Sequence, residues 1–367
     1  MSLWRCVMNK TLFLLTLIPL LLLTNLGFSE DGFRTIFNGQ NLDGWRNINC
    51  APNTWSVKDG MIHCTGKPIG ELRTLKMYEN FILELEWRHL KPRGNAGIFV
   101  WADAYPAKGQ PFHRGVEVQV LENAYGNTRG YTTHGDIFPI HGATMTPING
   151  RGGSRAFPTE HRSKPSPEWN HYRVVCDDGE ISLAVNGKVV TRGTAAKPRK
   201  GYICLESEGS PVQFRNLKIK ELPGTNPKPE EIAKKDEGFY SLYTGVDLSG
   251  WAGDSWKSND WRLTGGTDTK LFSKTHFASY SLFADWRSQA KWVPFELPGI
   301  GPLGELAHST DRWNRLEVTR TPGLVLITIN GKVVSKKTVK EQAPLKPGSI
   351  VLLPGGHFAN IFIKELK

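Results

Sequence analysis

Apolar and polar residues alternate with a period of two in many short segments of this chain. From Phe81 to Trp87 every second residue is large and apolar, and residues 181–185 repeat the pattern up to the dipeptide Asn186-Gly187. An Asn-Gly pair between apolar segments is a strong hairpin signal, because both positions of a type I′ turn need positive φ angles. Such segments, with almost no helical periodicity, predict an all-β protein of sandwich or jelly-roll domains.

The chain also repeats its own sequence, so we expect two copies of one scaffold. Residues 33–45 (FRTIFNGQNLDGW) return as residues 239–251 (FYSLYTGVDLSGW). Trp45 and a later Trp-Asn motif at Trp169 are 124 positions apart, whereas the matching Trp251 and Trp313 are 62 positions apart. The first copy therefore carries an insert in its middle, where we place function, although loop decoration is the plainer alternative.

These observations predict four segments. They are a signal peptide at 1–29, a first β-sandwich domain at 31–222, a linker at 223–235 and a shortened second β-sandwich at 236–367.

The first 29 residues have the three parts of a secretion signal. Two basic residues, Arg5 and Lys10, precede the apolar run 12–26, and small residues precede the acidic pair that follows. The run is shorter than the roughly 20 residues that span a bilayer and contains Pro19, which disfavours a retained anchor. We expect a secreted or periplasmic protein with no membrane span in the mature chain.

Charge adds little to this interpretation. The whole chain has 46 basic and 35 acidic residues, and the two signs are interleaved. Binding to nucleic acid is disfavoured because no basic stripe follows a backbone of phosphates. Attraction to an acidic polysaccharide or an anionic envelope surface stays open.

Four cysteines remain after the signal peptide: Cys50, Cys64, Cys176 and Cys204. In an exported chain they predict two disulfides. Of the three possible connectivities we favour the local one, Cys50–Cys64 and Cys176–Cys204. A zinc site is the less favoured alternative, because no Cys-x-x-Cys spacing occurs.

The insert contains a segment, 115–121, in which valines alternate with Glu117 and Gln119. An acid and an amide on one face of a strand suit a polar groove that binds sugar hydroxyls, and a plain solvated face is the alternative. On the neighbouring strand we expect Phe99 and Trp101 to lie on the same open face, where Trp101 could stack against a sugar.

Other polar residues of the first copy are candidates for chemistry. His134 and Asp136 are two positions apart, and with His141 they could form an acid/base pair or a divalent-metal site. Glu206 and Glu208 share a strand face and could contact a ligand. One further candidate, Arg73, could hold an oxyanion.

Several motifs together resemble one family, the 3-keto-disaccharide hydrolase domain, over residues 31–222. They are the opening Phe37-Asn38-Gly39 with Gly44-Trp45, Gly94-Asn95-Ala96-Gly97, Glu117-Val118-Gln119, Trp169-Asn170 with Asn186-Gly187, and Gly209-Ser210-Pro211. The resemblance implies a concanavalin A-like jelly roll, with Glu117, Gln119 and Asn95 at family positions. The chain departs from it at Trp101, where many relatives have Arg, and at Glu206-Ser207-Glu208, where relatives often have an Asp-His pair. The second copy matches only at its ends.

The resemblance implies a glycoside-cleaving enzyme acting on a 3-keto-disaccharide or related glycoside. A base, Glu117 or His134, would remove the C2 proton, and Asp136 or His141 would orient it or hold a divalent metal ion. An ordinary glycosidase using Glu117 with Glu206 or Asp136 is not excluded. The alternatives are a non-catalytic carbohydrate-binding module, and an envelope protein in which the second copy is a docking partner.

Overall fold

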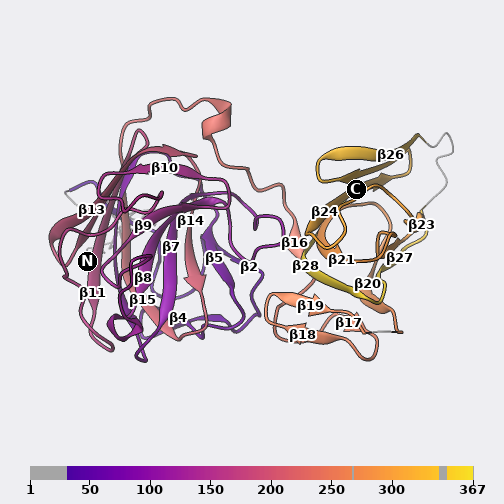
Figure 1. The fold of residues 1–367 in the computed structure, drawn as a ribbon, viewed down its shortest axis with the longest axis horizontal. Helices are drawn as coiled ribbons and strands as arrows, with labels where there is room; N and C mark the ends of the chain where they lie inside the picture. Colours follow the sequence, from indigo (N-terminus) through magenta and orange to yellow (C-terminus); the bar gives the residue numbers. More distant parts are fainter. Residues whose placement is uncertain (1–30, 267, 339–344, 367) are drawn as a thin grey trace, which may run out of the picture.

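A computed structural model describes residues 31–266, 268–338 and 345–366 of the 367-residue chain. The predicted signal peptide lies outside these residues. Within them no helix has the length and hydrophobicity needed to cross a bilayer. The structure has two lobes of β-sheet, one from each copy of the repeat (Figure 1). Each lobe contains two antiparallel sheets, so the predicted all-β fold with two sandwiches is confirmed.

The first sandwich joins a nine-stranded sheet, ordered β10-β13-β12-β11-β6-β15-β4-β3 with β1 beside β15, to a six-stranded sheet, ordered β2-β5-β14-β7-β8-β9. Its elements are β1 (Arg34–Thr35), β2 (Trp45–Ile48), β3 (Trp55–Lys58), β4 (Met61–Cys64), β5 (Gly70–Thr74), β6 (Phe81–His89), β7 (Asn95–Ala102), β8 (Gly115–Leu121), the 3-10 turn η1 (Asn123–Tyr125), β9 (Ile137–Ile140), β10 (Thr144–Pro147), β11 (Asn170–Asp177), β12 (Glu180–Val185), β13 (Lys188–Lys197), β14 (Tyr202–Ser207) and β15 (Val212–Glu221).

The second sandwich joins an eight-stranded sheet, ordered β18-β19-β28-β21-β24-β25-β26 with β16 beside β28, to a five-stranded sheet, ordered β17-β20-β27-β22-β23. Its elements, after the 3-10 turn η2 (Pro229–Glu231) of the linker, are β16 (Tyr240–Ser241), β17 (Trp251–Ala252), β18 (Lys257–Asn259), β19 (Arg262–Thr264), β20 (Leu271–Phe277), β21 (Tyr280–Ser288), β22 (Phe295–Leu297), β23 (Gly301–Pro302), β24 (Asn314–Thr321), β25 (Leu324–Ile329), β26 (Lys332–Thr338), β27 (Gly348–Leu352) and β28 (Gly356–Glu365).

The two sandwiches have the same strand order, apart from β9 and β10, which occur only in the first. The predicted hairpin at Asn186-Gly187 forms, and the second copy has the same turn at Asn330-Gly331. Asn186 and Gly187 have φ angles of 48° and 89°, and Asn330 and Gly331 have 52° and 78°. These positive angles are the ones that a type I′ turn requires.

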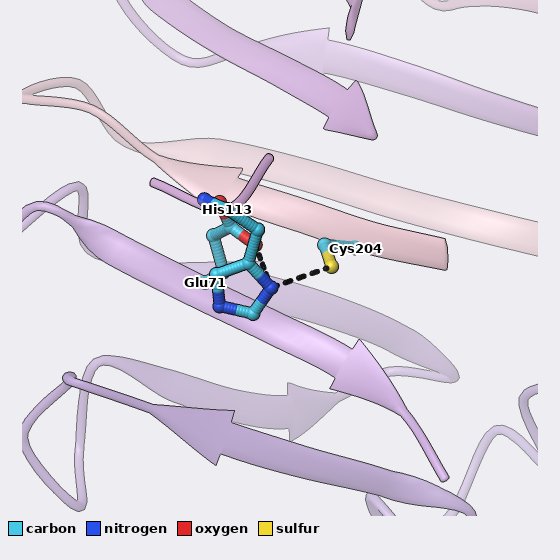
Figure 2. Close-up of side chains that lie close together, drawn as sticks. All are labelled: Glu71, His113 and Cys204. Carbon is cyan, nitrogen blue, oxygen red and sulfur yellow. Dashed lines mark hydrogen bonds and ion pairs between the residues drawn. The ribbon is translucent and has the colours of Figure 1, made fainter. Parts of the chain in front are cut away.

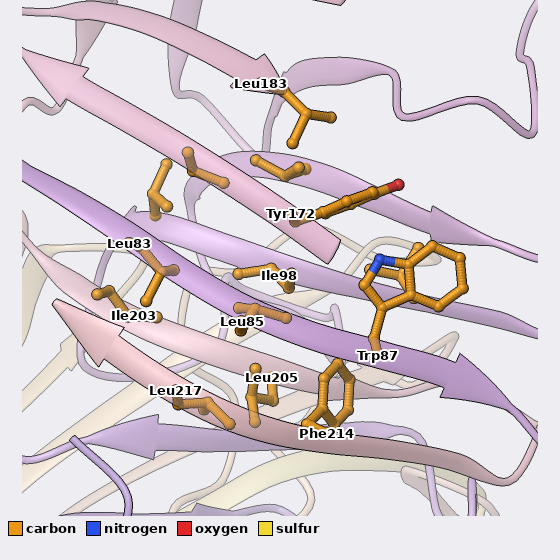
Figure 3. Packing of buried hydrophobic residues seen from close by; sticks show 14 of the residues in the cluster. Leu83, Leu85, Trp87, Ile98, Tyr172, Leu183, Ile203, Leu205, Phe214 and Leu217 are labelled. Carbon is orange, nitrogen blue, oxygen red and sulfur yellow. The ribbon is translucent and has the colours of Figure 1, made fainter. Parts of the chain in front are cut away.

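The core of the first sandwich lies between its two sheets (Figure 3). On β6 the alternating burial expected from the sequence is observed, with Leu83 and Leu85 buried. They face Ile98 and Leu205 of the six-stranded sheet, so apolar side chains from both sheets fill the interior. The other face of the six-stranded sheet therefore presents the alternate residues of β5, β14, β7 and β8.

The two sandwiches pack against each other through the segment between β7 and β8, residues 103–114, which we call the docking loop. Asp285 of β21 accepts a hydrogen bond from the backbone N–H of Gly109 at 2.8 Å. The amide nitrogen of Asn360 donates to the carbonyl of Gln110 at 2.9 Å and to Asp285 at 2.8 Å. Tyr105 packs edge-on against aromatic rings of the second sandwich. The second sandwich thus holds one loop of the first in place.

The predicted disulfides are wrong, because all four cysteines are free and buried. Cys176 points into the core between the sheets, whereas Cys204 packs on the opposite face of the six-stranded sheet. Cys50 follows β2 in that same sheet, and Cys64 lies on β4 of the nine-stranded sheet, where its sulfur accepts from the N–H of Gly66 at 3.3 Å. Cys176 and Cys204 cannot pair, because they lie on opposite faces of the six-stranded sheet.

Candidate active site

Three glutamates from two strands meet on the outer face of the six-stranded sheet. In the register of the sheet Gly97 of β7 pairs with Gln119 of β8, and β14 runs along the other side of β7. A Cβ atom on Gly97 would lie 2.8 Å from Oε1 of Glu117 and 2.8 Å from Oε2 of Glu206. The missing side chain of Gly97 therefore leaves the space into which both carboxyl groups point.

Amide side chains connect these acids. The side-chain nitrogen of Gln119 donates to Oδ1 of Asn95 at 3.0 Å and lies 3.4 Å from Oε1 of Glu117. Glu208, at the end of β14, is hydrogen-bonded to both Asn95 and Glu206. The five residues form one network, which we call the glutamate site: Asn95, Glu117, Gln119, Glu206 and Glu208. The sequence had predicted all five.

Burial shifts the protonation of the three acids. Desolvation, followed by repulsion from Glu208, raises the pKa of both Glu117 and Glu206 well above the usual range. Glu208 is only partly covered, and burial raises its pKa to about 7. Glu206 therefore keeps its proton and donates to Glu208, so that Glu208 ionises first. A neutral acid beside an ionisable base is the arrangement used in general acid–base catalysis.

A positive charge that sequence reasoning missed lies beside the site. One guanidinium nitrogen of Arg155 is 3.0 Å from Asp136 and 3.4 Å from Oε1 of Gln119. Its guanidinium also lies 3.4 Å above the ring of Phe138, which pairs with Glu117 across β8 and β9. Arg155 follows the glycine-rich stretch 150–153, where no periodicity gives a side chain a predictable direction.

Asp136 holds Arg155 in place. Its carboxylate accepts from the backbone and hydroxyl of Thr132 as well as from Arg155, and it is fully buried. With its acceptor sites engaged in this way, Asp136 orients the guanidinium. Asp136 was predicted as a catalytic residue, but here it acts through Arg155 and does not itself face a ligand.

His134 does not contact any of the glutamates by a hydrogen bond among the described residues. Its ring stacks on His161 with 3.8 Å between centroids, and its Nε2 lies 3.2 Å from the amide of Asn127. Burial and the neighbouring His161 lower the pKa of His134 to about 4. His134 is therefore neutral at pH 7, packed in the loop before β9.

The predicted role of Trp101 as an exposed sugar platform is wrong. Trp101 has a φ of 54°, and the register of β14 against β7 shifts beside it. Its ring therefore turns into the core, where it is fully buried against Phe81, and its Nε1 donates to the carbonyl of Glu79 at 2.7 Å. Phe99 does lie on the outer face, but Phe112 of the docking loop covers it.

The predicted role of Arg73 as an oxyanion holder is also wrong. Its guanidinium is fully buried, pairs with Asp236 and lies 4.0 Å above the ring of Tyr202. Asp236 also binds Arg46 at 2.6 Å and accepts from the hydroxyl of Tyr105 at 2.5 Å. Arg73 thus anchors the start of the second domain to the first.

His141 lies apart from the glutamate site. It lines a groove of about 950 Å³ between the sandwiches, together with Arg114 of the docking loop and Arg315 of β24. Burial lowers the pKa of His141. The structure thus does not bring the three predicted residues His134, Asp136 and His141 together as a metal site.

A second polar cluster occupies the same face of the sheet, under the docking loop (Figure 2). It consists of Glu71 on β5, Cys204 on β14 and His113, and it could hold a metal ion, since one ligand atom from each lies within 4.8 Å of the others. Burial raises the pKa of Glu71 to about 7 and lowers that of His113 to about 3. No sequence motif indicated this cluster, because its members come from three distant segments.

Comparisons with known proteins find several that are similar to this chain. The 3-keto-disaccharide hydrolase of Bacteroides thetaiotaomicron is 24% identical over 237 residues, which are 52% of this chain and 79% of that protein. Two solved structures described as candidate glycosyl hydrolases from Parabacteroides distasonis are similar as well. One is 25% identical with a TM-score of 0.41, covering 53% of this chain and 95% of its own, and the other is 22% identical with a TM-score of 0.38, covering 52% and 99%.

The match to a family profile covers almost all of the first sandwich. Residues 32–220 match the profile described as a 3-keto-alpha-glucoside-1,2-lyase-like domain. These residues contain every member of the glutamate site, together with Arg155 and Asp136. The chain therefore belongs to the family of 3-keto-alpha-glucoside-1,2-lyase-like proteins, which the sequence motifs had predicted.

Proposed function

We propose that the first sandwich is an exported enzyme that cleaves the glycosidic bond of a 3-keto-disaccharide or a related 3-keto-glycoside. The observation that carries the proposal is the convergence of Glu117 and Glu206 over Gly97, next to a third acid, Glu208, that ionises near neutral pH. Family membership and the activity named for the relative from Bacteroides thetaiotaomicron support the choice of substrate class.

The reaction uses the acidity that a ketone at C3 confers on the C2 proton. Glu208 takes that proton, and the electron pair becomes the enolate. The enolate then re-forms the ketone and expels the oxygen at C1, leaving a C1–C2 double bond. Glu206 or Glu117, whose pKa burial raises well above the usual range, protonates the departing oxygen. Water then adds at C1 and a proton returns to C2, so the net result is hydrolysis.

Arg155 supplies the positive charge that the enolate needs. It is partly exposed beside Gln119, and Asp136 fixes its orientation. A charged donor aimed at developing negative charge is usually a large contribution to catalysis in a site with little water. Asn95 and Gln119 are left to bind sugar hydroxyls.

Hydrolysis in D₂O tests the mechanism together with the activity. The purified full chain is incubated with a 3-keto-disaccharide, and the 3-keto-hexose released is examined by mass spectrometry and NMR. Elimination followed by hydration places one deuterium at C2 at the rate of release, above the exchange that the free 3-keto-hexose undergoes in D₂O with and without the protein, whereas direct displacement at C1 adds no deuterium beyond that exchange. Release without deuterium at C2 contradicts the mechanism. Binding of the sugar without any release contradicts the activity and favours a carbohydrate-binding module.

A further inference from the structure

The cluster of Glu71, His113 and Cys204 has the separations of a metal site. Nδ1 of His113 lies 3.3 Å from Oε2 of Glu71 and 3.7 Å from the sulfur of Cys204. Zinc bonds of about 2.0–2.3 Å at tetrahedral angles place neighbouring ligand atoms roughly 3.3–3.6 Å apart. The two measured distances are therefore close to the edges of one tetrahedron around a shared ion.

Hydrogen bonds alone leave this cluster incompletely paired. Neutral imidazole has at Nδ1 either a proton or a lone pair, so it cannot both donate to Glu71 and accept from Cys204, and the Cys204 thiol donates to Glu71 instead. Nε2 of His113 has no hydrogen-bond partner among the described residues, Oε2 of Glu71 has only its 3.3 Å contact with Nδ1 of His113, and all three side chains are fully buried. Unpaired polar atoms at such depth are costly, and they commonly mark an ion or another ligand.

We propose that Glu71, His113 and Cys204 bind a zinc ion. One sulfur, one nitrogen and one oxygen ligand suit a borderline-soft ion such as zinc, whereas calcium and magnesium prefer oxygen ligands alone. Three protein ligands leave the fourth tetrahedral position to water. The positive ion also offsets the cost of burying a carboxylate and a thiolate together.

This zinc site adjoins the glutamate site, because Glu71 pairs with Glu206 across β5 and β14, and it ties the docking loop to the sheet. His113 ends the docking loop, whereas Glu71 and Cys204 belong to the sheet beneath it. The ion therefore fastens the loop to the sheet from below. From the other side Asp285 and Asn360 of the second sandwich hold the same loop. Metal binding thereby stabilises the contact between the two sandwiches.

The test measures metal content, without substrate. The full chain is purified without added metal, equilibrated with micromolar zinc and a competing chelator, and analysed by plasma mass spectrometry. We expect one zinc ion per chain in the wild type and at least a tenfold loss of retained zinc in Cys204→Ser. The matched control is Cys176→Ser, which removes an equally buried thiol on β11 and should retain the ion.

Cobalt substitution of the wild type gives a second readout that needs no variant to fold. A thiolate ligand produces a sulfur-to-cobalt charge-transfer band in the near ultraviolet, and tetrahedral geometry gives strong visible bands. Absence of bound metal, retention of zinc by folded Cys204→Ser, or a cobalt spectrum without the thiolate band would each overturn the proposal. Because no sugar is involved, this result is independent of whether the glutamate site cleaves a glycoside.

Discussion

The two sandwiches share one strand order but differ in the sheet that carries the chemistry. In the first, β7 and β8 span Asn95–Ala102 and Gly115–Leu121 and present Glu117 and Gln119 on the outer face. Their positional counterparts in the second, β22 and β23, span only Phe295–Leu297 and Gly301–Pro302. The insert has thus enlarged one sheet of a common scaffold.

The second sandwich has almost no acid on the corresponding sheet. Among its described strands β17, β20, β27, β22 and β23, the one carboxylate is that of Glu296, which pairs with Lys270 at 2.7 Å. Its other sheet instead holds the docking loop through Asp285. The polar cluster thus occurs where the strands are long and a loop covers them, whereas the sheet with short strands lacks one.

Among these tests, replacement of Glu208 by Gln should change the activity of the first sandwich most. The amide cannot remove the C2 proton, so kcat should fall by about 10³-fold, within the range for loss of a general base. Turnover of a 3-keto-disaccharide measures it. Glu296→Gln on the second sandwich is the matched control and should keep wild-type turnover. Equal activity of both variants would show that the acid on the first sandwich's sheet matters no more for turnover than the acid on the second's.

Gly97→Ala should cause the next largest loss of activity. Its methyl group would meet Glu117 and Glu206 at 2.8 Å and push both carboxyl groups aside. Misplacement of catalytic groups by about 1 Å costs roughly 10²-fold in rate. The control is Gly323→Ala in the second sandwich, where an added Cβ meets no atom within 4 Å. Unchanged kcat in Gly97→Ala would mean that the two acids do not act over the glycine.

Asp285→Ala tests the supporting role of the second sandwich. It leaves Arg315 without its carboxylate partner, which binds it at 2.7 and 2.8 Å, and releases the N–H of Gly109. Breaking a buried pair in this way costs about 3 kcal/mol in the free energy of unfolding. Urea denaturation checks it, with exposed Glu317→Ala on β24 as control. A loss no larger than that of the control would show that the contact carries little stability.

The smallest expected change is in how the stability of the fold depends on pH. Because the folded pKa of Glu208 is about 7, above the usual 4.5, the folded state binds this proton more tightly than the unfolded state. Stability from this group is therefore fully present below pH 4.5 and is lost as the pH rises through 7. Relative to Glu208→Gln, the wild type should lose stability over this interval in thermal melts. A constant difference between the two proteins would contradict the shift.

Much of this could be predicted from local patterns. The alternation in β6, the Asn-Gly turns and the internal repeat sufficed for the fold, since each depends on residues near in sequence. The acids of the glutamate site were found for the same reason, because side chains two apart on a strand share a face. The prediction for Trp101 was wrong because its positive φ reverses the alternation of inward and outward side chains along β7. Arg155 and His113 were missed, because their places depend on loops.

The aromatic contact around Tyr105 has a practical consequence for anyone dissecting this chain. Ile48 and Tyr105 of the first sandwich share a cluster with Phe239, Phe283 and Phe362 from the other side. A fragment that stops near residue 222 would expose Ile48 and Tyr105 to water. Such an exposed apolar patch favours self-association. If such a fragment aggregates or is inactive, the cause can be this exposed apolar surface, and the result does not test the chemistry of the glutamates.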